Sequence, residues 1–285
     1  MFTKSESVGL LVRLALTGAV LALLVCSPVA AGDGQMRTVT LAPHLTELVY
    51  EIGAQEHLVG VVEWSNWPEE AKALPRIGSA FRFDMEAILS LDTELALAWS
   101  GGTPPAVGQQ LENLGIEVLW LQTRSLDEIA EAVELLGQRL ETTRPAREIA
   151  DRFRSKTERL RERYKDNPPA SIFYQVSAQP LFTLGGRHVI SEVFRTCGAH
   201  NIFDDLDTEA AAVDREAVIA RQPDFIIAGS SDESAEALAK WEESRLVDRE
   251  QTRLVAVDAD LLVRPNLRII EGIEFICELV AEAAN

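Results

Sequence analysis

The side chains that could carry out catalysis or bind a metal are few and scattered in this 285-residue sequence. Its four histidines, His44, His57, His188 and His200, form no His-x-x-x-His pair and accompany no Cys-x-x-Cys, so there is no zinc signature. The phosphate-binding patterns Gly-x-x-x-x-Gly-Lys-Ser/Thr and Gly-x-Gly-x-x-Gly are absent, as is the Gly-x-Ser-x-Gly of many hydrolases. No motif in the sequence identifies a catalytic nucleophile. An exported enzyme whose catalytic groups come from distant loops is a remote alternative.

Tryptophans offer a different chemistry, because an aromatic ring can cover a flat apolar ligand. Trp64 lies in an expected loop, and Trp99 ends an expected strand that Ser100-Gly101-Gly102 follows. Ligands of open α/β sheets bind beyond the carboxyl ends of the strands, so Trp64 and Trp99 are candidate ligand contacts. Trp120, inside an expected strand, and Trp241, in a polar stretch, are better explained by packing.

Composition argues against several kinds of partner. The chain has 27 basic and 45 acidic residues, a formal net charge of −18. Nucleic acids and anionic lipid headgroups are recognised by basic surfaces, so neither is an expected partner. Apolar residues make up 47% and charged residues 25%, which is typical of a soluble protein with a substantial core.

Residues 1–31 are predicted to be a secretory signal peptide. Lys4 and Arg13 precede an uncharged run from Leu14 to Cys26, which is shorter than the about 20 residues of a membrane span. Val29-Ala30-Ala31 offers small residues at the cleavage site, so cleavage is expected after Ala31. A membrane anchor is one alternative; lipidation of Cys26 is another, which the large Val25 before it disfavours.

Export leaves two cysteines, Cys197 and Cys277. Two thiols in an oxidising compartment suggest one disulfide, which would close a loop of about 80 residues and contribute up to ~4 kcal/mol. Two buried free thiols are the alternative, because a sequence does not show geometry.

One pattern occurs twice along the chain. Residues 45–54 match residues 190–199, each with a hydroxyl residue followed by Glu and, further on, a Gly-Ala pair. Residues 84–98 match residues 214–228, each with an Asp that opens a short helix before an acidic residue and an apolar strand. Two matches in the same order indicate two lobes of related fold.

The predicted fold class is α/β, with two Rossmann-like lobes of open, mostly parallel sheets joined by a single long helix. Continuous apolar runs predict parallel strands covered on both faces. Ser125-Leu126-Asp127-Glu128 is a capping box that opens an amphipathic helix. The expected strands are Thr38–Ala42, Leu58–Val62, Leu95–Trp99, Val118–Gln122, Ser171–Val176, Phe225–Gly229 and Leu254–Val257.

The segment from Pro145 to about Lys165 predicts the connecting helix, because Ile149, Phe153 and Leu160 recur at helical spacing. A helix of about 20 residues is about 30 Å long, and a single rigid connector limits hinge motion. The expected domains are an N-terminal lobe at 32–142, the connecting helix at 143–167 and a C-terminal lobe at 168–285.

Several motifs together resemble the substrate-binding proteins of ABC importers, in the group whose lobes are joined by one helix, and within it the cobalamin-binding members. The resemblance covers Thr38 to Glu278. It implies a periplasmic, monomeric, non-enzymatic protein without a cofactor. Its transported ligand would be cobalamin or a related corrinoid, and its partner an ABC transporter permease dimer. The family's disulfide falls on Cys197 and Cys277. The motifs are Ala42-Pro43-His44-Leu45-Thr46-Glu47-Leu48, Trp64-Ser65-Asn66-Trp67-Pro68, Leu97-Ala98-Trp99-Ser100-Gly101-Gly102, Leu114-Gly115-Ile116-Glu117-Val118-Leu119-Trp120, Cys197-Gly198-Ala199-His200-Asn201-Ile202-Phe203 and Arg264 to Cys277.

The resemblance also implies roles for particular residues. An aromatic often stands where this chain has Leu261, so that wall of the ligand site is expected to be more open. Arg264 is expected to hydrogen-bond an amide or phosphate of the ligand. Glu86 and Glu216 correspond to the glutamates that dock the permease; without the resemblance they would be solvated residues at helix starts. The ligand contacts carry over to Pro43, Trp64, Trp99, Asp260, Leu261, Leu262, Val263 and Arg264.

Haem and ferric siderophores are the rival ligands on the same fold. Haem needs an axial Tyr, His or Met, and His44 is the one candidate near the expected cleft, where it is better explained by helix capping or packing. A siderophore site would favour several basic residues, whereas Arg264 stands nearly alone.

Overall fold

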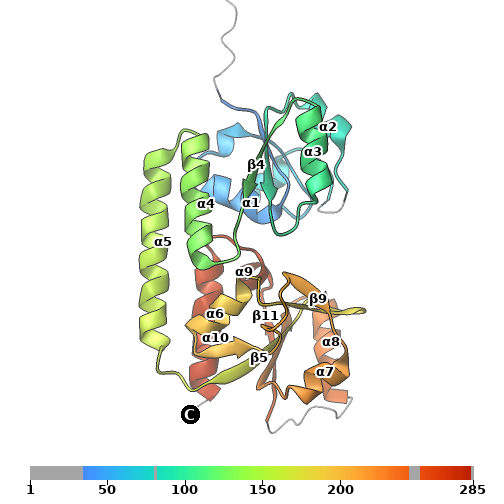
Figure 1. Ribbon diagram of the computed structural model, residues 1–285, viewed down its shortest axis with the longest axis vertical. Helices are drawn as coiled ribbons and strands as arrows, with labels where there is room; N and C mark the ends of the chain where they lie inside the picture. Colours follow the sequence, from blue (N-terminus) through green and yellow to red (C-terminus); the bar gives the residue numbers. More distant parts are fainter. Residues whose placement is uncertain (1–34, 80–81, 244–250, 284–285) are drawn as a thin grey trace, which may run out of the picture. The chain divides into compact units, whose positions relative to one another are not determined.

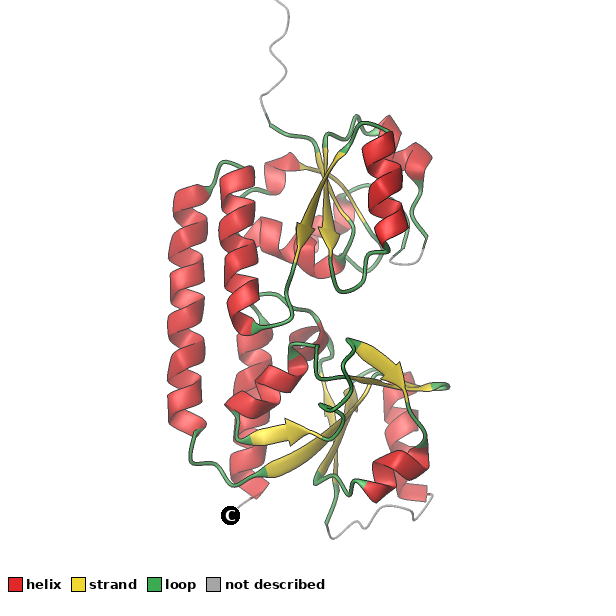
Figure 2. Ribbon diagram, viewed as in Figure 1, coloured by secondary structure: helices red, strands yellow, loops and turns green. Residues whose placement is uncertain are grey.

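Two parallel four-stranded sheets, each packed with helices, carry the fold of this computed structural model (Figure 1, Figure 2). The structure describes residues 35–79, 82–243 and 251–283, and from Met36 on the chain forms one compact unit. The predicted signal peptide, residues 1–31, lies outside the described residues. None of the helices among the described residues is long and apolar enough to span a membrane.

The N-terminal lobe is built on the sheet β2-β1-β3-β4, whose strands are all parallel. The four predicted strands are confirmed within two residues at each end. Asp84 caps the short helix α2, as expected, since its side chain accepts a hydrogen bond from the Ala87 N–H at 2.9 Å. The elements are β1 Thr38–Thr40, α1 Pro43–Glu51, a 3-10 helix Gln55–His57, β2 Leu58–Val61, a 3-10 helix Glu69–Ala73, α2 Met85–Ser90, β3 Leu95–Trp99, α3 Pro105–Asn113, β4 Glu117–Leu121 and α4 Leu126–Arg139.

The C-terminal lobe repeats this plan with the parallel sheet β11-β10-β5-β8. Asp214 caps α7 through the Ala217 N–H at 2.7 Å, which matches Asp84 in the first lobe and supports the internal repeat. A small antiparallel sheet, β6-β7-β9, was not predicted. The elements are β5 Ala170–Gln175, β6 Ser177–Ala178, β7 Leu181–Leu184, α6 Ile190–Thr196, β8 Ala199–Asn201, β9 Ala210–Ala212, α7 Arg215–Ala220, β10 Phe225–Gly229, α8 Asp232–Glu243, β11 Arg253–Val257, α9 Asp260–Val263 and α10 Ile269–Ala283.

One helix, α5 (Thr143–Tyr164), connects the lobes and confirms the predicted connector. Figure 1 shows it running alongside α4 and α10, and it packs against both. Its inner face is apolar because buried side chains recur every three or four residues. Those residues are Ala146, Ala150, Phe153, Thr157, Leu160 and Tyr164.

The predicted disulfide joins α6 to α10. Cys197, the C-cap of α6, is bonded to Cys277 of α10, and both residues are fully buried. The bond ties the two helices together at the core of the C-terminal lobe. Trp241 is fully buried in a second apolar cluster of this lobe, where its ring meets Phe173 edge-on and its Nε1 donates to the Gln175 side chain at 2.6 Å, as its interpretation as a packing residue requires.

Candidate functional site

Three of the predicted ligand residues lie where the strands of the N-terminal sheet end. Pro43 begins α1 three residues after β1 ends, and Trp99 is the last residue of β3. Trp64 lies in the loop that follows β2, within the segment Trp64–Trp67 that we call the aromatic loop. Because the carboxyl ends of parallel strands meet at one edge of a sheet, the fold gathers these residues at that edge.

Trp64 is the most exposed large apolar residue among the described residues, with 75% of its surface accessible. Its backbone has φ = 66°, in the left-handed region that a bulky side chain rarely adopts. Trp67 in the same loop is 46% exposed. Exposed aromatics on a strained loop are typical of a ligand-contacting surface.

Trp99 is held more firmly than Trp64. Its ring meets His44 edge-on, with 5.1 Å between the ring centres. The backbone of Gly101 and Gly102 lies against the ring so closely that a Cβ atom at Gly102 would come within 2.3 Å of it. The two glycines are therefore needed to seat Trp99, which remains partly exposed at the sheet edge.

His44 is buried beside Trp99, at 3% exposure. Burial chiefly, and then the charges of Arg264 and His188, lower the pKa of His44 to about 3, so the imidazole is neutral. Its Nε2 has no hydrogen-bond partner among the described residues, and the same is true of Trp99 Nε1. No group of three or more His, Cys, Asp or Glu residues in the described part of the chain could hold a metal ion.

The predicted ligand segment of the C-terminal lobe forms α9 and the residue after it. Asp260, Leu261 and Val263 are partly exposed, whereas Leu262 is fully buried. Leu262 therefore packs in the core, and the exposed members of the segment are the ones with surface available for a ligand. Arg264 follows the helix with an extended backbone.

Arg264 makes four contacts with protein groups. Its Nε lies 2.9 Å from Asp260 Oδ1, and its Nη1 donates to Glu47 Oε1 and to Asn66 Oδ1, each at 2.8 Å. Its Nη2 donates to the Trp64 carbonyl oxygen at 3.1 Å. A guanidinium offers five N–H donors, so these contacts use four of them. The residue predicted to hydrogen-bond the ligand is thus engaged mainly in holding the N-terminal lobe.

Glu47 lies at the centre of this network and was not among the predicted site residues. Its side chain is 1% exposed, and its Oε2 accepts from Asn266 Nδ2 at 2.7 Å and from Arg268 Nη1 at 3.4 Å. Burial raises the pKa of Glu47, and the hydrogen bond from Arg264 opposes that rise. The repeated hydroxyl-Glu pair in the sequence was the signal that could have singled out this residue.

The two glutamates predicted to dock a permease occupy equivalent places. Glu86 and Glu216 are each the second residue of a six-residue helix, α2 and α7, two positions after the capping aspartate. Both side chains are exposed. A pocket of about 510 Å³ is lined by Glu86, Glu63 and the cap Asp84, and also by Arg82, so this surface carries more negative than positive charge.

Comparison with known proteins identifies the family. The sequence model described as periplasmic binding protein matches residues 39–249. The chain belongs to this family. Its members are binding proteins and not enzymes, so the alternative of an exported enzyme is discarded.

Several proteins are similar to this periplasmic binding protein over most of its length. A vitamin B12-binding protein of Vibrio cholerae is 34% identical over 241 residues, 85% of this chain and 87% of the relative. One of Pectobacterium atrosepticum is 34% identical over 266 residues, 91% and 93% of the two chains. The crystal structure of the periplasmic vitamin B12-binding protein BtuF of Vibrio cholerae has 33% identity and a TM-score of 0.79, covering 88% of this chain and 98% of that one.

A haem-binding relative shares the fold alone. The periplasmic haem-binding protein RhuT of Roseiflexus has 22% identity and a TM-score of 0.76, and covers 88% of this chain and all of that one. Its likeness confirms the two-lobed architecture of this binding protein and carries no statement about the ligand.

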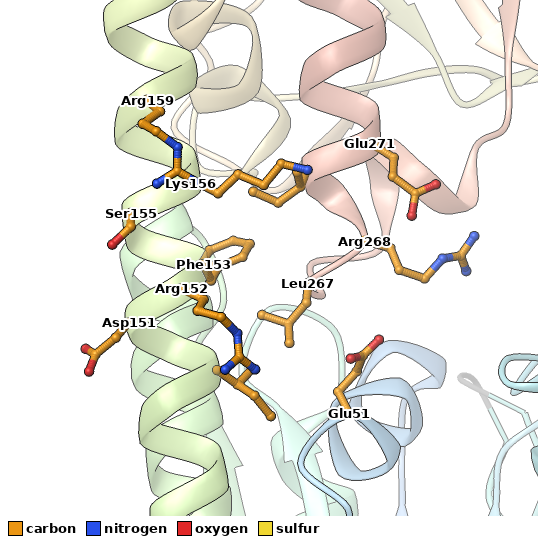
Figure 3. A pocket seen from close by; sticks show the side chains of 12 residues that line it. Glu51, Asp151, Arg152, Phe153, Ser155, Lys156, Arg159, Leu267, Arg268 and Glu271 are labelled. Atoms are coloured by element: carbon orange, nitrogen blue, oxygen red, sulfur yellow. The ribbon is translucent and has the colours of Figure 1, made fainter.

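A pocket of about 680 Å³ lies between α5 and the start of α10 in this binding protein (Figure 3). Arg152 and Phe153 point from α5 toward Leu267 across the pocket, whereas Asp151 points away. Charges of both signs line it, and Lys156 pairs with Glu274 at 3.1 Å, so its lining selects no ligand class. The pocket is lined by Glu51, Ile149, Asp151, Arg152, Phe153, Ser155, Lys156, Arg159, Leu267, Arg268, Ile270 and Glu271, and by neither Trp64 nor Trp99.

Proposed function

We propose that this periplasmic binding protein captures cobalamin or a related corrinoid and delivers it to the permease of an ABC importer. The observation that carries the proposal is the 34% identity, over 85% of the chain, to a relative named vitamin B12-binding protein. Family membership implies a transported ligand and an ABC transporter partner. The corrinoid is the finer step that an experiment has to test.

The residues at the sheet edge suit a large, flat, largely apolar ligand. Trp64 and Trp99 would contact its ring system, and Pro43 would lie beside them at the start of α1. From the other lobe, Asp260, Leu261 and Val263 would face the ligand, with Leu262 behind them in the core. Arg264 would offer the ligand at most its one remaining N–H. This arrangement favours apolar contact over ionic recognition.

Delivery would use surfaces away from the ligand. Glu86 and Glu216 would pair with basic residues of two like permease subunits, since the two helix starts are equivalent in the two lobes. Export would follow cleavage after Ala31, and the mature protein would act as a monomer. The proposed domain bounds remain 32–142, 143–167 and 168–285, around the connecting helix.

Haem is the second candidate ligand, and one observation favours it. The neutral imidazole of His44 has an Nε2 without a partner among the described residues, as an axial iron ligand would before binding. Its 3% exposure is unfavourable for such a role, because the ring would first have to reach the surface. A ferric siderophore is less suited, because Arg264 is occupied by protein acceptors.

Calorimetric titration of the mature protein with cyanocobalamin, cobinamide and haemin tests the proposal. We expect saturable one-to-one binding of at least one corrinoid and weak or no binding of haemin. Tight haemin binding that is lost in His44→Ala, with no corrinoid binding, would replace the corrinoid by haem.

A further inference from the structure

Two arginines of the C-terminal lobe hold the aromatic loop of the N-terminal lobe. Arg264 donates to Asn66 Oδ1 at 2.8 Å and to the Trp64 carbonyl oxygen at 3.1 Å. The guanidinium carbon of Arg268 lies 4.3 Å from the centre of the Trp67 ring, which is a cation–π contact. Three residues of a four-residue loop are therefore contacted from the opposite lobe.

Both arginines converge on the buried carboxylate of Glu47, Arg264 at 2.8 Å and Arg268 at 3.4 Å. The arginine side chains are themselves only 11% and 17% exposed. An ion pair buried to this degree fixes its partners, because moving one of them leaves an uncompensated charge in the interior. Glu47 thus anchors the two guanidinium groups in the positions from which they reach the loop.

The base of the aromatic loop has its own support within the N-terminal lobe. Arg76 Nη1 donates to the carbonyl oxygens of Val62 at 3.2 Å and Ser65 at 3.1 Å, and Thr46 Oγ1 donates to Ser65 Oγ at 3.1 Å. Ser65 is fully buried. Trp64 is 75% exposed, so packing of its side chain against the protein does little to hold its position. The exposed part of the loop, with its left-handed residue, depends on the arginines from the other lobe.

We propose that Arg264 and Arg268, anchored by Glu47, are positioning residues that order the aromatic loop before the ligand arrives. This deepens the proposed function, on which its consequence for corrinoid affinity rests. A loop ordered in advance loses less conformational freedom on binding, so the apparent affinity is higher. Because the contacts cross between the lobes, the order of the loop also depends on the lobes staying in contact.

Hydrogen exchange of the ligand-free protein tests the positioning role directly. In Arg264→Gln, we expect the backbone amides of the aromatic loop to exchange about tenfold faster or more, while those of β1 and β5 keep their rates. Asn66→Ala is the milder variant, since it removes one loop contact and leaves the pairs of Glu47 intact. Arg152→Gln is the matched control, because Arg152 lines the same pocket as Arg268 from the opposite side, on α5, and so removes a guanidinium that does not hold the loop (Figure 3).

Titration of the same variants with cyanocobalamin completes the test. We expect the loss of affinity to follow the gain in loop exchange, and Arg268→Lys, which keeps the charge near Glu47, to lose less than Arg268→Gln. Reduced affinity in Arg264→Gln with unchanged loop exchange would overturn the proposal and make Arg264 a direct ligand contact. Faster loop exchange in a protein that binds no corrinoid would support the positioning role and overturn the corrinoid assignment instead.

Discussion

Glu47 and Glu192 stand at matching positions of the internal repeat, and each carboxylate reaches across to the opposite lobe. Glu47 pairs with Arg264 of the C-terminal lobe at 2.8 Å. Glu192 accepts from the Leu126 N–H, at the start of α4 in the N-terminal lobe, at 2.8 Å, and from Arg161 of α5 at 3.3 Å. The repeat thus supplies one inter-lobe anchor from each side.

The two anchors are predicted to differ in strength, because their burial differs. The Glu47 side chain is 1% exposed and that of Glu192 is 23% exposed. Glu47→Gln removes the buried carboxylate that Arg264 and Arg268 share, so that Arg264 keeps Asp260 as its carboxylate partner, and it should lower the free energy of unfolding by about 3 kcal/mol. Glu192→Gln should lower the free energy of unfolding by less than about 1 kcal/mol, since water screens both its ion pair with Arg161 and its contact with the start of α4. Urea unfolding of the two variants measures the difference, and equal losses would contradict this account.

Trp64 is predicted to serve the ligand and not the fold. Because its side chain is 75% exposed, Trp64→Ala should leave the melting temperature unchanged. Loss of a stacking aromatic should weaken the free energy of corrinoid binding by about 2 kcal/mol, which is roughly a thirtyfold loss of affinity. Phe275→Ala is the matched control, an aromatic on α10 that is 38% exposed and lies outside the proposed site. If both variants bind cyanocobalamin equally well, Trp64 does not contact the ligand.

The elements that could be predicted from the sequence are those with local signals. Strands β3 and β10 were predicted with the bounds that they have, because buried parallel strands are continuous apolar runs. The caps Asp84 and Asp214 were predicted because an N-cap bonds an amide only three residues away. The connecting helix was found from its apolar spacing, and its end was placed within a few residues.

What the sequence did not yield depends on distant contacts or on weak local patterns. Arg264 and Glu47 are 217 residues apart, and no spacing rule joins them, so Arg264 was assigned to the ligand alone. The strands β6 and β9 have two and three residues, too few for a periodic pattern. Helix α10 did carry a signal that was overlooked, an apolar stripe in which Ile269, Ile273 and Ile276 recur at helical spacing.

Two buried histidines predict that the protein loses stability in mild acid. Burial above all lowers the pKa of His44 to about 3 and that of His188 to about 4, against 6.5 for each ordinary side chain. Below pH 6.5 the unfolded chain therefore binds protons that the folded chain does not. The free energy of unfolding therefore keeps its full value above pH 6.5. It decreases progressively as the pH falls toward the pKa values that the two histidines have in the folded protein. Each histidine should lower the free energy of unfolding by about 1 kcal/mol between pH 6.5 and 5.5.

Urea unfolding at pH 6.5 and 5.5 measures this dependence. Glu47 works in the opposite direction, because its raised pKa lets the folded state take up a proton as the pH falls. The comparison with His188→Gln isolates one histidine: that variant should be less sensitive to the pH change by about 1 kcal/mol. An unchanged sensitivity would mean that His188 is not a buried neutral group.

We expect Glu86 and Glu216 to dock the permease and not to hold the ligand. They start equivalent helices of the two lobes and are exposed, while the aromatic residues proposed for the ligand lie on other elements. A permease of two like subunits would meet such a pair with two basic patches, and each close charge pair across an interface can contribute about 1.5 kcal/mol or more. Reversal of both charges, Glu86→Arg with Glu216→Arg, should therefore abolish the complex with the permease and ligand uptake.

Ligand affinity should change less than about threefold in that double variant, because an exposed charge is screened beyond about 10 Å. The control reverses two other exposed glutamates, Glu112→Arg with Glu278→Arg, and so carries the same change in net charge. Pull-down of the permease beside cyanocobalamin titration separates the two roles. Because the docking pairs are electrostatic, added salt should weaken the wild-type complex as well. Loss of ligand binding with an intact permease complex would assign the two glutamates to the ligand, and equal loss of docking in the control would reduce their role to net charge.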